Sequence, residues 1–418
     1  MTKIEFGYGK TKMAVEVGEK NLLSSLLPRK QENCGDYRAV LKESLAHPIG
    51  SQKLREIAKA GQKVALIISD VTRPCPSYKI LPFVVEQLND AGVKDEDIVI
   101  VSGLGSHRKQ SAKEHERLVG ADLFHRVKVV DSDVEDFVLV GESSQGTPFE
   151  VFRPVAKADI RVAVGNIDYH YFAGYSGGCK AIVPGVCTRS TIEKNHSMML
   201  LRDAKVGKAD GNPVREDIEE ILQFLSLDFI VNVVLNEEKE IVAAVSGHPI
   251  EAHRKGCAIL DALYKQPITE LADIVIASPG GLPKDLNVYQ AQKALDNAQW
   301  AVKEGGIIIL VGECGEGYGE KTFECWVNEA NCAEDLLKRI QADFKLGGHK
   351  AAAIAKVSQK AKIFLVSSLP KEKAEKLYMT PFSDLQTAYD AAVTEKGQNA
   401  TVYCMTVGGT TLPCCGEV

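Results

Sequence analysis

The sequence predicts an α/β protein with two tandem α/β domains, each built on a largely parallel sheet, and an active-site cleft between the domains. Short runs of consecutive apolar residues, typical of the buried strands of a parallel sheet, recur along the chain. Segments with apolar residues at helical spacing separate these runs, and strand–helix–strand repetition is typical of a parallel sheet covered by helices. The length of 418 residues suits two or three domains of roughly 100–200 residues each.

In the first half of the chain the pattern begins with the apolar run VALIIS at 64–69. A helix is predicted over 76–92, because Leu81, Val84 and Leu88 recur at helical spacing, and a second helical stretch begins at Ser111. The further strands predicted in this half are 97–101, 127–130, 160–164 and 229–235.

In the second half, the run DIVIA at 273–277 is followed by a predicted helix over 287–303. The further strands predicted there are 307–311, 363–366 and 401–405. We place the domain boundary within 265–270, where Gln266–Pro267 interrupts the periodicity. The predicted domains are therefore an N-terminal α/β domain, 1–265, and a C-terminal α/β domain, 266–418.

Composition excludes several classes of function. The chain has 50 Lys and Arg against 56 Asp and Glu and no basic run, which argues against a nucleic-acid partner held by phosphate neutralisation. It has no stretch near the ~18–20 apolar residues of a membrane span, and its N-terminus alternates apolar and polar residues instead of forming a signal peptide. The 11 cysteines are odd in number and widely spread, which favours reduced thiols and a cytoplasmic location.

Ligands of open α/β sheets bind beyond the carboxyl ends of the strands, so functional residues are expected in the loops after strands. SDVTRP, at 69–74, follows the first strand, and its Asp70, Thr72 and Arg73 can hold a polar ligand, since Arg binds carboxylate or phosphate with a two-pronged fork. An Asp/Thr turn ended by proline is an equally good interpretation.

The segment GLGSHR, at 103–108, follows the next strand and places His107 where glycines let a ligand approach the backbone. It lacks the third glycine of a dinucleotide-binding fingerprint, and an ordinary surface histidine is the alternative interpretation.

The richest segment, 165–196, reads GNIDYHYFAGYSGGCKAIVPGVCTRSTIEKNH. Its glycines allow tight turns, and Phe172 and Tyr175 offer faces on which a planar ring can stack. Lys180 lies between glycines and an apolar stretch, where desolvation would lower its pKa and make it a nucleophile. Thr188 or Ser190 is expected to cap a helix that carries His196 near its first turns. A glycine-rich connection with a solvated lysine is the alternative.

A fourth segment, PGGLPKDLNVYQAQK at 279–293, follows the first strand of the second half. Tyr289, Gln290 and Lys293 fall within about one helical turn and can meet the carboxylate and hydroxyl of a substrate. The alternative is the polar side of an amphipathic helix. His349 lies at a predicted helix start and has no assigned role.

Together these four segments, which span residues 70–293, resemble in order and spacing the nickel-pincer lactate racemase (LarA-like) family. The resemblance implies a nickel cofactor, pyridinium-3-thioamide-5-thiocarboxylic acid mononucleotide, which carries two sulfur arms and a carbon–nickel bond. It implies that Lys180 forms a thioamide with this cofactor and that His196 binds the nickel. It also implies that His107 and His170 act as acid/base groups on opposite sides of the substrate.

Nine further residues are assigned by the resemblance. Those expected to hold the cofactor are Asp70, Thr72, Phe172, Gly177 and Gly178. Those expected to orient the substrate are Arg73, Tyr289, Gln290 and Lys293. Cys179 matches no family role. The implied partners are a small 2-hydroxy acid, either lactate or a related hydroxy or sugar acid, and the enzymes that make the cofactor.

The chemistry of a 2-hydroxy acid is compatible with this interpretation. The α-hydrogen is a poor acid because the neighbouring carboxylate is already negative, so oxidation by hydride transfer to a planar 2-keto acid, followed by hydride return, is the easier route to racemisation or epimerisation. Two histidines give either enantiomer a base for its hydroxyl proton, and nickel suits a flat tridentate ligand plus one imidazole. Two alternatives stay open. One is an NAD(P)-dependent 2-hydroxyacid dehydrogenase, which the missing G-x-G-x-x-G weakens. The other is a non-catalytic nickel or nucleotide carrier.

Overall fold

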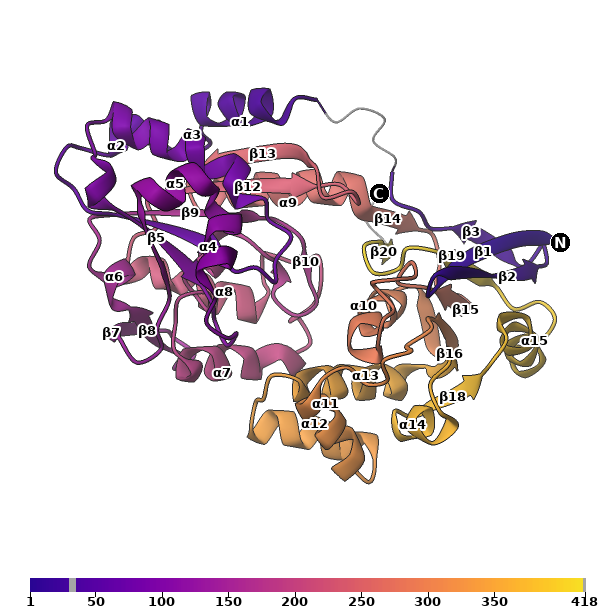
Figure 1. Ribbon diagram of the computed structural model, residues 1–418. Helices are drawn as coiled ribbons and strands as arrows, with labels where there is room; N and C mark the ends of the chain where they lie inside the picture. Colours follow the sequence, from indigo (N-terminus) through magenta and orange to yellow (C-terminus); the bar gives the residue numbers. More distant parts are fainter. Residues whose placement is uncertain (30–34, 416–418) are drawn as a thin grey trace. The chain divides into compact units, whose positions relative to one another are not determined.

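The computed structural model describes residues 1–29 and 35–415, which divide into two compact units (Figure 1). Residues 35–262 form the first, called here the central unit, and residues 1–29 together with 263–415 form the second, called the terminal unit. Each contains a six-stranded sheet with helices packed on it, and nearly all neighbouring strands of both sheets are parallel. The predicted α/β class with largely parallel sheets is confirmed.

The sheet of the central unit contains all five strands predicted for the first half of the chain. Only its edge pair, β12 with β13, is antiparallel. In order across the sheet, the strands are β13 (Ile241–Gly247), β12 (Phe229–Leu235), β9 (Ile160–Asn166), β4 (Val64–Ser69), β5 (Ile98–Gly103) and β6 (Lys128–Asp131). Two small antiparallel pairs lie outside it: β7 (Phe137–Glu142) with β8 (Pro148–Phe152), and β10 (Tyr169–His170) with β11 (Gly174–Tyr175).

One face of this sheet is covered by the first five helices. Alternate strand residues such as Leu66 and Val162 join Leu41 and Leu81 in one buried core, as the period of two along a strand requires. The helices of the unit are α1 (Tyr37–Ala46), α2 (Leu54–Ile57), α3 (Ser77–Asp90), α4 (Ala112–Val119), α5 (Ala121–Arg126), α6 (Arg153–Ala156), α7 (Arg189–Ser197), α8 (Pro213–Glu219) and α9 (Glu251–Tyr264). The 3-10 turns are η1 (Asp95–Asp97), η2 (Gly178–Ala181), η3 (Met198–Leu200) and η4 (Glu220–Gln223).

Strand register brings the candidate loops of the central unit to one edge of the sheet. Ser69 at the end of β4 pairs with Gly103 of β5, and Ile68 pairs with Val164 of β9. Because these strands are parallel, the loops that leave them at 70–74, 104–108 and 167–180 begin side by side.

The sheet of the terminal unit is parallel throughout. Its strands, in order across the sheet, are β18 (Met379–Phe382), β17 (Lys362–Val366), β16 (Val302–Val311), β15 (Ala272–Ala277), β19 (Val402–Met405) and β3 (Leu22–Ser25). The other strands are the hairpin β1 (Thr2–Tyr8) and β2 (Thr11–Val17), and the pair β14 (Lys265–Ile268) and β20 (Leu412–Cys415). The helices are α10 (Val288–Ala298), α11 (Lys321–Glu329), α12 (Ala333–Ala342), α13 (Gly348–Lys360), α14 (Lys371–Lys376) and α15 (Leu385–Lys396).

The division of the chain differs from the two consecutive domains expected, 1–265 and 266–418. Residues 1–29 belong with the C-terminal segment, because β3 extends the terminal sheet beside β19. The hairpin contributes Phe6 and Val15 to the core that β15, β16 and β17 form with α15. The later break falls at 262/263, close to the predicted 265–270, although 265–268 form the strand β14.

The helix predicted over 287–303 is shorter in the structure. α10 ends at Ala298, and Val302 and Lys303 already belong to β16, where Val302 pairs with Ala272. Val302 lies at a position that fits the helical spacing of the sequence, which is why the predicted helix was too long. In the structure it is a buried residue of a strand.

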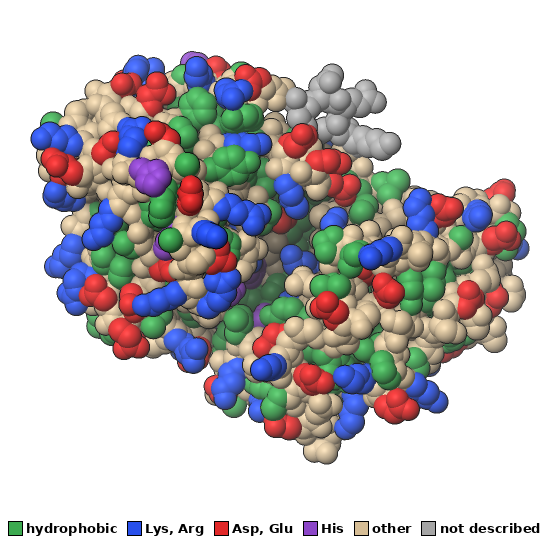
Figure 2. Space-filling model, viewed as in Figure 1, with side chains coloured by type: hydrophobic (Ala, Val, Ile, Leu, Met, Phe, Trp, Pro, Cys, Tyr) green, Lys and Arg blue, Asp and Glu red, His purple; other side chains and the backbone are tan. Residues whose placement is uncertain are grey.

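Basic and acidic side chains are interspersed over the visible surface of each unit (Figure 2). Among the described residues, no helix is both long and apolar enough to cross a membrane. The ten cysteines within the described ranges are all free thiols.

Candidate active site

The loop after β4 and the loop after β5 meet through Asp70 and His107. Oδ2 of Asp70 lies 2.6 Å from Nδ1 of His107, and the hydroxyl of Thr72 donates to Oδ1 at 2.7 Å. Burial favours the neutral carboxyl, but the hydrogen bonds from His107 and Thr72 lower the pKa of Asp70 below its usual 3.8. Both oxygens of this ionised, buried carboxylate thus contact side chains of the chain itself.

Three aromatic rings from the segment after β9 and from α7 pack together. Phe172 contacts His170 edge to face at 4.5 Å between ring centroids and His196 at 4.8 Å. Phe172 and His196 are buried, whereas His170 is half-buried. The predicted base, the predicted metal ligand and the predicted packing residue are therefore neighbours.

His196 lies in the last turn of α7, not near the first turns as expected, because the helix already ends at Ser197. Thr188 does occupy the N-cap position, but its side chain makes no cap; its hydroxyl donates instead to the carboxylate of Glu150. The Nδ1 atom of His196 lies 3.0 Å from Oδ1 of Asn195.

Gly177 and Gly178 let the chain turn tightly just before Lys180. Both have positive φ, 79° and 59°, which side chains with a Cβ rarely adopt. A Cβ at Gly177 would lie 2.7 Å from Oδ1 of Asn232, and one at Gly178 would lie 3.0 Å from Cδ2 of His253. These glycines therefore bring the backbone against buried polar side chains and start η2, which carries Lys180.

Lys180 and His170 lie in a cationic, partly desolvated environment. Burial, Arg215 and Arg73 all hold the pKa of Lys180 well below 10.5. Burial is also the main cause that lowers the pKa of His170 well below 6.5, and the charges of Lys180, His196 and Arg73 lower it further. Both side chains are therefore shifted toward their uncharged forms. Within the part of the chain that the structure describes, Nζ of Lys180 has no hydrogen-bond or ion-pair partner.

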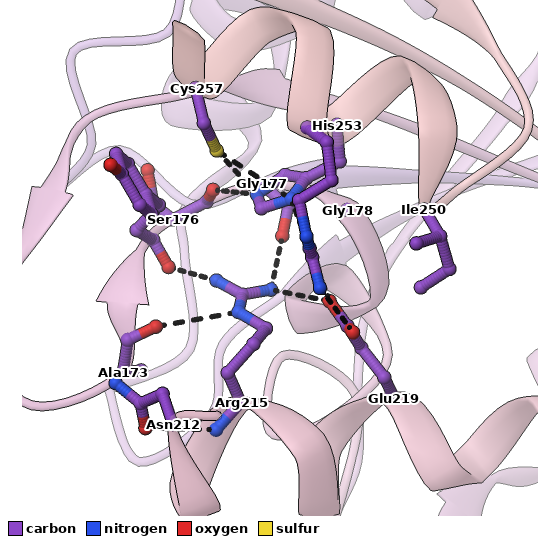
Figure 3. Close-up of polar contacts among 12 residues, drawn as sticks. Ala173, Ser176, Gly177, Gly178, Asn212, Arg215, Glu219, Ile250, His253 and Cys257 are labelled. Carbon is purple, nitrogen blue, oxygen red and sulfur yellow. Dashed lines mark hydrogen bonds and ion pairs between the residues drawn. The ribbon is translucent and has the colours of Figure 1, made fainter. Parts of the chain in front are cut away.

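Four buried polar side chains that were not predicted from the sequence hold this loop: Asn212, Arg215, Asn232 and His253. Figure 3 shows Asn212, Arg215 and His253 around it. Asn212 caps α8 and also donates to the carbonyl of Phe172, whereas Asn232 accepts from the backbone N–H of Gly178. Arg215 and His253 donate to further loop carbonyls. The dipeptide Asn212–Pro213 is a typical helix start, but nothing in the local sequence indicates that α8 and α9 lie under the loop.

The predicted substrate residues Tyr289, Gln290 and Lys293 lie on α10 of the terminal unit. Gln290 and Lys293 are exposed, and the ring of Tyr289 faces Nζ of Lys350 at 4.0 Å. His349 is buried, 6.4 Å from the Tyr289 ring between centroids, and burial lowers its pKa to about 3. The other predicted site residues all belong to the central unit; no group of three or more metal-ligating side chains occurs among the residues described.

Comparison with known proteins identifies the family. A model of the lactate racemase N-terminal domain matches residues 8–207, and one of the lactate racemase C-terminal domain matches residues 268–411. The chain belongs to the lactate racemase family. Within this family, it is 32% identical over 408 residues to a lactate racemase from Thermoanaerobacterium thermosaccharolyticum, which covers 94% of both chains. A lactate racemase from Lactiplantibacillus plantarum is 32% identical over 330 residues, 77% of both chains.

Solved structures agree with the assignment to the lactate racemase family. The lactate racemase apoprotein from Thermoanaerobacterium thermosaccharolyticum matches with a TM-score of 0.89 at 30% identity, covering 99% of this chain and all of that one. A Thermotoga maritima protein, at 19% identity and a TM-score of 0.64, covers 90% of this chain and 97% of its own and shares the fold. The protein is thus an isomerase of the racemase class. This assignment argues against the two alternatives, a dehydrogenase and a non-catalytic carrier.

Proposed function

We propose that this racemase-family protein interconverts the enantiomers of lactate or of a related small 2-hydroxy acid, with a nickel-pincer nucleotide attached to Lys180. The observation that carries the proposal is the convergence of Lys180, His170, His196 and Arg73, close enough for their charges and rings to interact, at one edge of the central sheet. The names of the relatives, lactate racemases from two organisms, support lactate as the first substrate to test.

The residues present fit such a cofactor. An uncharged Lys180 amine is the nucleophile that a thioamide link requires, and a phosphate or thiocarboxylate would meet a surrounding rich in positive charge from Arg73 and Arg215. His196 can give one imidazole nitrogen to nickel, and Phe172, packed against it, can cover a planar ring. When bound, the cofactor would supply a reversible hydride acceptor for the carbon that bears the hydroxyl group.

His107 is suited to take the hydroxyl proton. The Asp70 carboxylate accepts from Nδ1–H of His107, so the neutral ring has an unprotonated Nε2. A carboxylate that holds a histidine in this form and stabilises its protonated state is the usual support of a general base. Arg73 is exposed and can therefore orient the substrate carboxylate.

His170 is held in the opposite form. The backbone N–H of Ala173 donates to Nδ1 of His170 at 3.2 Å, so the neutral ring carries its proton on Nε2. A neutral imidazole can donate this hydrogen to a substrate oxygen and polarise it. For His170 to act as the base toward the other enantiomer, its proton must first move to Nδ1, which requires the contact with Ala173 to break.

The proposal is tested on protein produced together with cofactor-biosynthesis enzymes. We expect an intact mass excess of a few hundred daltons that maps to the Lys180 peptide, about one nickel per chain, and loss of optical rotation when the protein acts on either enantiomer of lactate. Lys180→Ala should lack the mass, whereas Lys194→Ala, an exposed lysine on α7, should keep it. An unmodified wild-type mass under conditions that load a known family member would refute the cofactor assignment. A loaded protein that is inactive on lactate but active on another 2-hydroxy acid would correct the substrate.

A further inference from the structure

Arg215 is the most deeply buried charged side chain beneath the glycine loop. Its side chain has no exposed surface, and its guanidinium donates to three loop carbonyls: Nε to Ala173 at 3.3 Å, Nη1 to Gly177 at 3.3 Å, and Nη2 to Tyr175 (Figure 3). A planar fork with five N–H donors can hold several acceptors in fixed positions, which a lysine cannot do.

The carbonyls between these three are held as well. Nδ2 of Asn212 donates to Phe172 O at 2.8 Å, and Nε2 of His253 donates to Ser176 O at 2.8 Å. His253 can donate there because Nη1 of Arg254 lies 3.0 Å from its Nδ1, and burial together with Arg215 keeps the pKa of His253 well below 6.5. The loop between His170 and Lys180 is therefore fixed almost residue by residue from α8 and α9.

Arg215 reaches Lys180 through a shared acceptor. The carbonyl of Gly177 accepts from Nη1 of Arg215 and also from the backbone N–H of Lys180, both at 3.3 Å. This bond begins η2, so a shift of the guanidinium would move the turn that presents the lysine.

The charge of Arg215 is only partly balanced. Its nearest carboxylate, Glu219, lies 3.9 Å away and is bound at 2.8 Å through both oxygens by Arg254. An arginine remains protonated when buried, so part of its positive charge acts on the amine of Lys180.

We propose that Arg215 is the positioning residue for Lys180: its fork fixes the glycine loop and the turn that presents the lysine, and its positive charge acts on the amine to which the cofactor would attach. The inference rests on the proposed function, in which Lys180 is the attachment site. Arg215 itself touches neither substrate nor cofactor in this role.

Several ionisable groups act on the two side chains. Those that act on Lys180 are Arg73, Arg215 and His170. Those that act on Arg215 are Glu219, Cys257, Cys179, Arg254, His170, Lys180 and His253. Burial raises the pKa of Cys179 and Cys257 to about 12 each, so both thiols stay neutral below pH 10. Ionisation of the thiols therefore does not interfere with a lysine titration in that range.

The test measures acylation of Lys180 by trace acetic anhydride in cofactor-free protein between pH 5 and 10, read by peptide mass spectrometry. The uncharged amine attacks an anhydride carbonyl, loses its proton and releases acetate, so the rate follows the uncharged fraction. We expect the midpoint of the wild-type Lys180 profile to lie at a lower pH than that of an exposed lysine such as Lys194. Arg215→Gln should move the midpoint upward and slow acylation by about tenfold for each pH unit of the shift.

Two further variants separate charge from geometry and guard against misfolding. Arg215→Lys should keep the low midpoint but lose hydrogen-exchange protection within 173–180, because the donors of a lysine all lie on one nitrogen and cannot reach the three carbonyls that Nε, Nη1 and Nη2 of Arg215 hold apart. Arg161→Gln is the matched control: Arg161 is also buried in the central unit and donates to the carbonyls of Val155, Ala156 and Ala158. Arg161→Gln should change neither the acylation midpoint of Lys180 nor the hydrogen-exchange protection within 173–180.

An Arg215→Gln protein with the wild-type acylation profile overturns the charge role, and an Arg215→Lys protein with wild-type loop protection overturns the positioning role. If Arg215→Gln does not fold, Arg215→Lys and Arg215→Met decide in its place by the same criteria. The acylation test uses cofactor-free protein, so its outcome does not depend on cofactor loading. A wild-type protein that never loads would count against the proposed function but would not change the conclusion about Arg215 and Lys180.

Discussion

Oδ2 of Asp70 and Nδ1 of His107 lie 2.6 Å apart, although the two residues come from loops after different strands. The carboxylate is buried, with 3% of its side chain exposed, and the ring is 29% exposed. Because Nδ1 is engaged by Asp70, Nε2 is the nitrogen left for a substrate. Thr72 fixes the second oxygen of Asp70, which leaves the carboxylate no other orientation. His107 is therefore a base whose Nδ1 is held by a carboxylate and whose Nε2 is available to the substrate.

Asp70→Asn should therefore reduce turnover without loss of the cofactor. The amide can donate to Nδ1 and turn the ring into the form that carries its proton on Nε2, which removes the basic nitrogen. Loss of general-base catalysis should lower kcat by about 10²–10⁴-fold. Intact mass, nickel content and kcat on each enantiomer are the measurements. Asp133→Asn, which alters an exposed ion pair with Lys109 and a contact with the backbone N–H of Glu135, should behave as wild type. A variant with wild-type kcat would contradict the role of Asp70.

His196→Ala should lose most of its nickel but retain the organic part of the cofactor on Lys180. The imidazole is the one side chain assigned to the metal, and it packs against Phe172 within the same cluster. Nickel per chain from elemental analysis, set against the intact mass, separates the two effects. The control is His248→Ala, whose imidazole is 43% exposed outside the cluster. Nickel at full occupancy in His196→Ala would assign the ligand elsewhere.

Much of the architecture follows from local sequence. The runs at 64–69 and 229–235 coincide with β4 and β12, because a strand buried on both faces must be apolar at every position. The loops that follow such strands gather at one sheet edge, so placing chemistry in the segments around Asp70, His107 and Lys180 required no knowledge of tertiary contacts.

Features that depend on distant contacts did not follow from the sequence. The partners of the glycine loop are far away in the chain: Arg215 is 40 residues from Tyr175, and His253 is 77 residues from Ser176. Their polar side chains in helices look like surface residues until packing buries them. Residues 1–29 were assigned to the wrong neighbour for the same reason, since β3 pairs with a strand near the other end of the chain.

Lys293→Ala should raise KM for the substrate without changing mass or nickel. Lys293 is an exposed cation on α10, a helix fixed at its start by the Asn287 cap, so its removal changes charge and not packing. If it binds the substrate carboxylate, a loss of about 1–3 kcal/mol, or roughly five- to 150-fold in KM, is expected. Lys338→Ala, exposed on α12, is the control. An unchanged KM would favour the interpretation of α10 as an ordinary amphipathic helix.

Asp296→Asn should stabilise the terminal unit above pH 7 and have little effect at pH 4. Burial in α10 raises the pKa of Asp296 to about 7, although Lys356 and Lys350 act in the opposite direction. The folded-state pKa lies above the usual 3.8, so the folded unit holds the proton more tightly, and this contribution is present below pH 4 and lost as the pH rises through 7. Above pH 7 the wild-type unit holds a buried carboxylate, which lowers its stability. The amide of Asn removes this charge, and its oxygen can still accept from Nε2 of Gln299.

Thermal unfolding of Asp296→Asn, measured at pH 4 and pH 8, should show a gain in Tm of roughly 2–4 °C per kcal/mol at pH 8 only. The exposed Asp390→Asn on α15 should shift neither value, and an equal gain at both pH values would show that the stabilisation comes from packing and not from the charge.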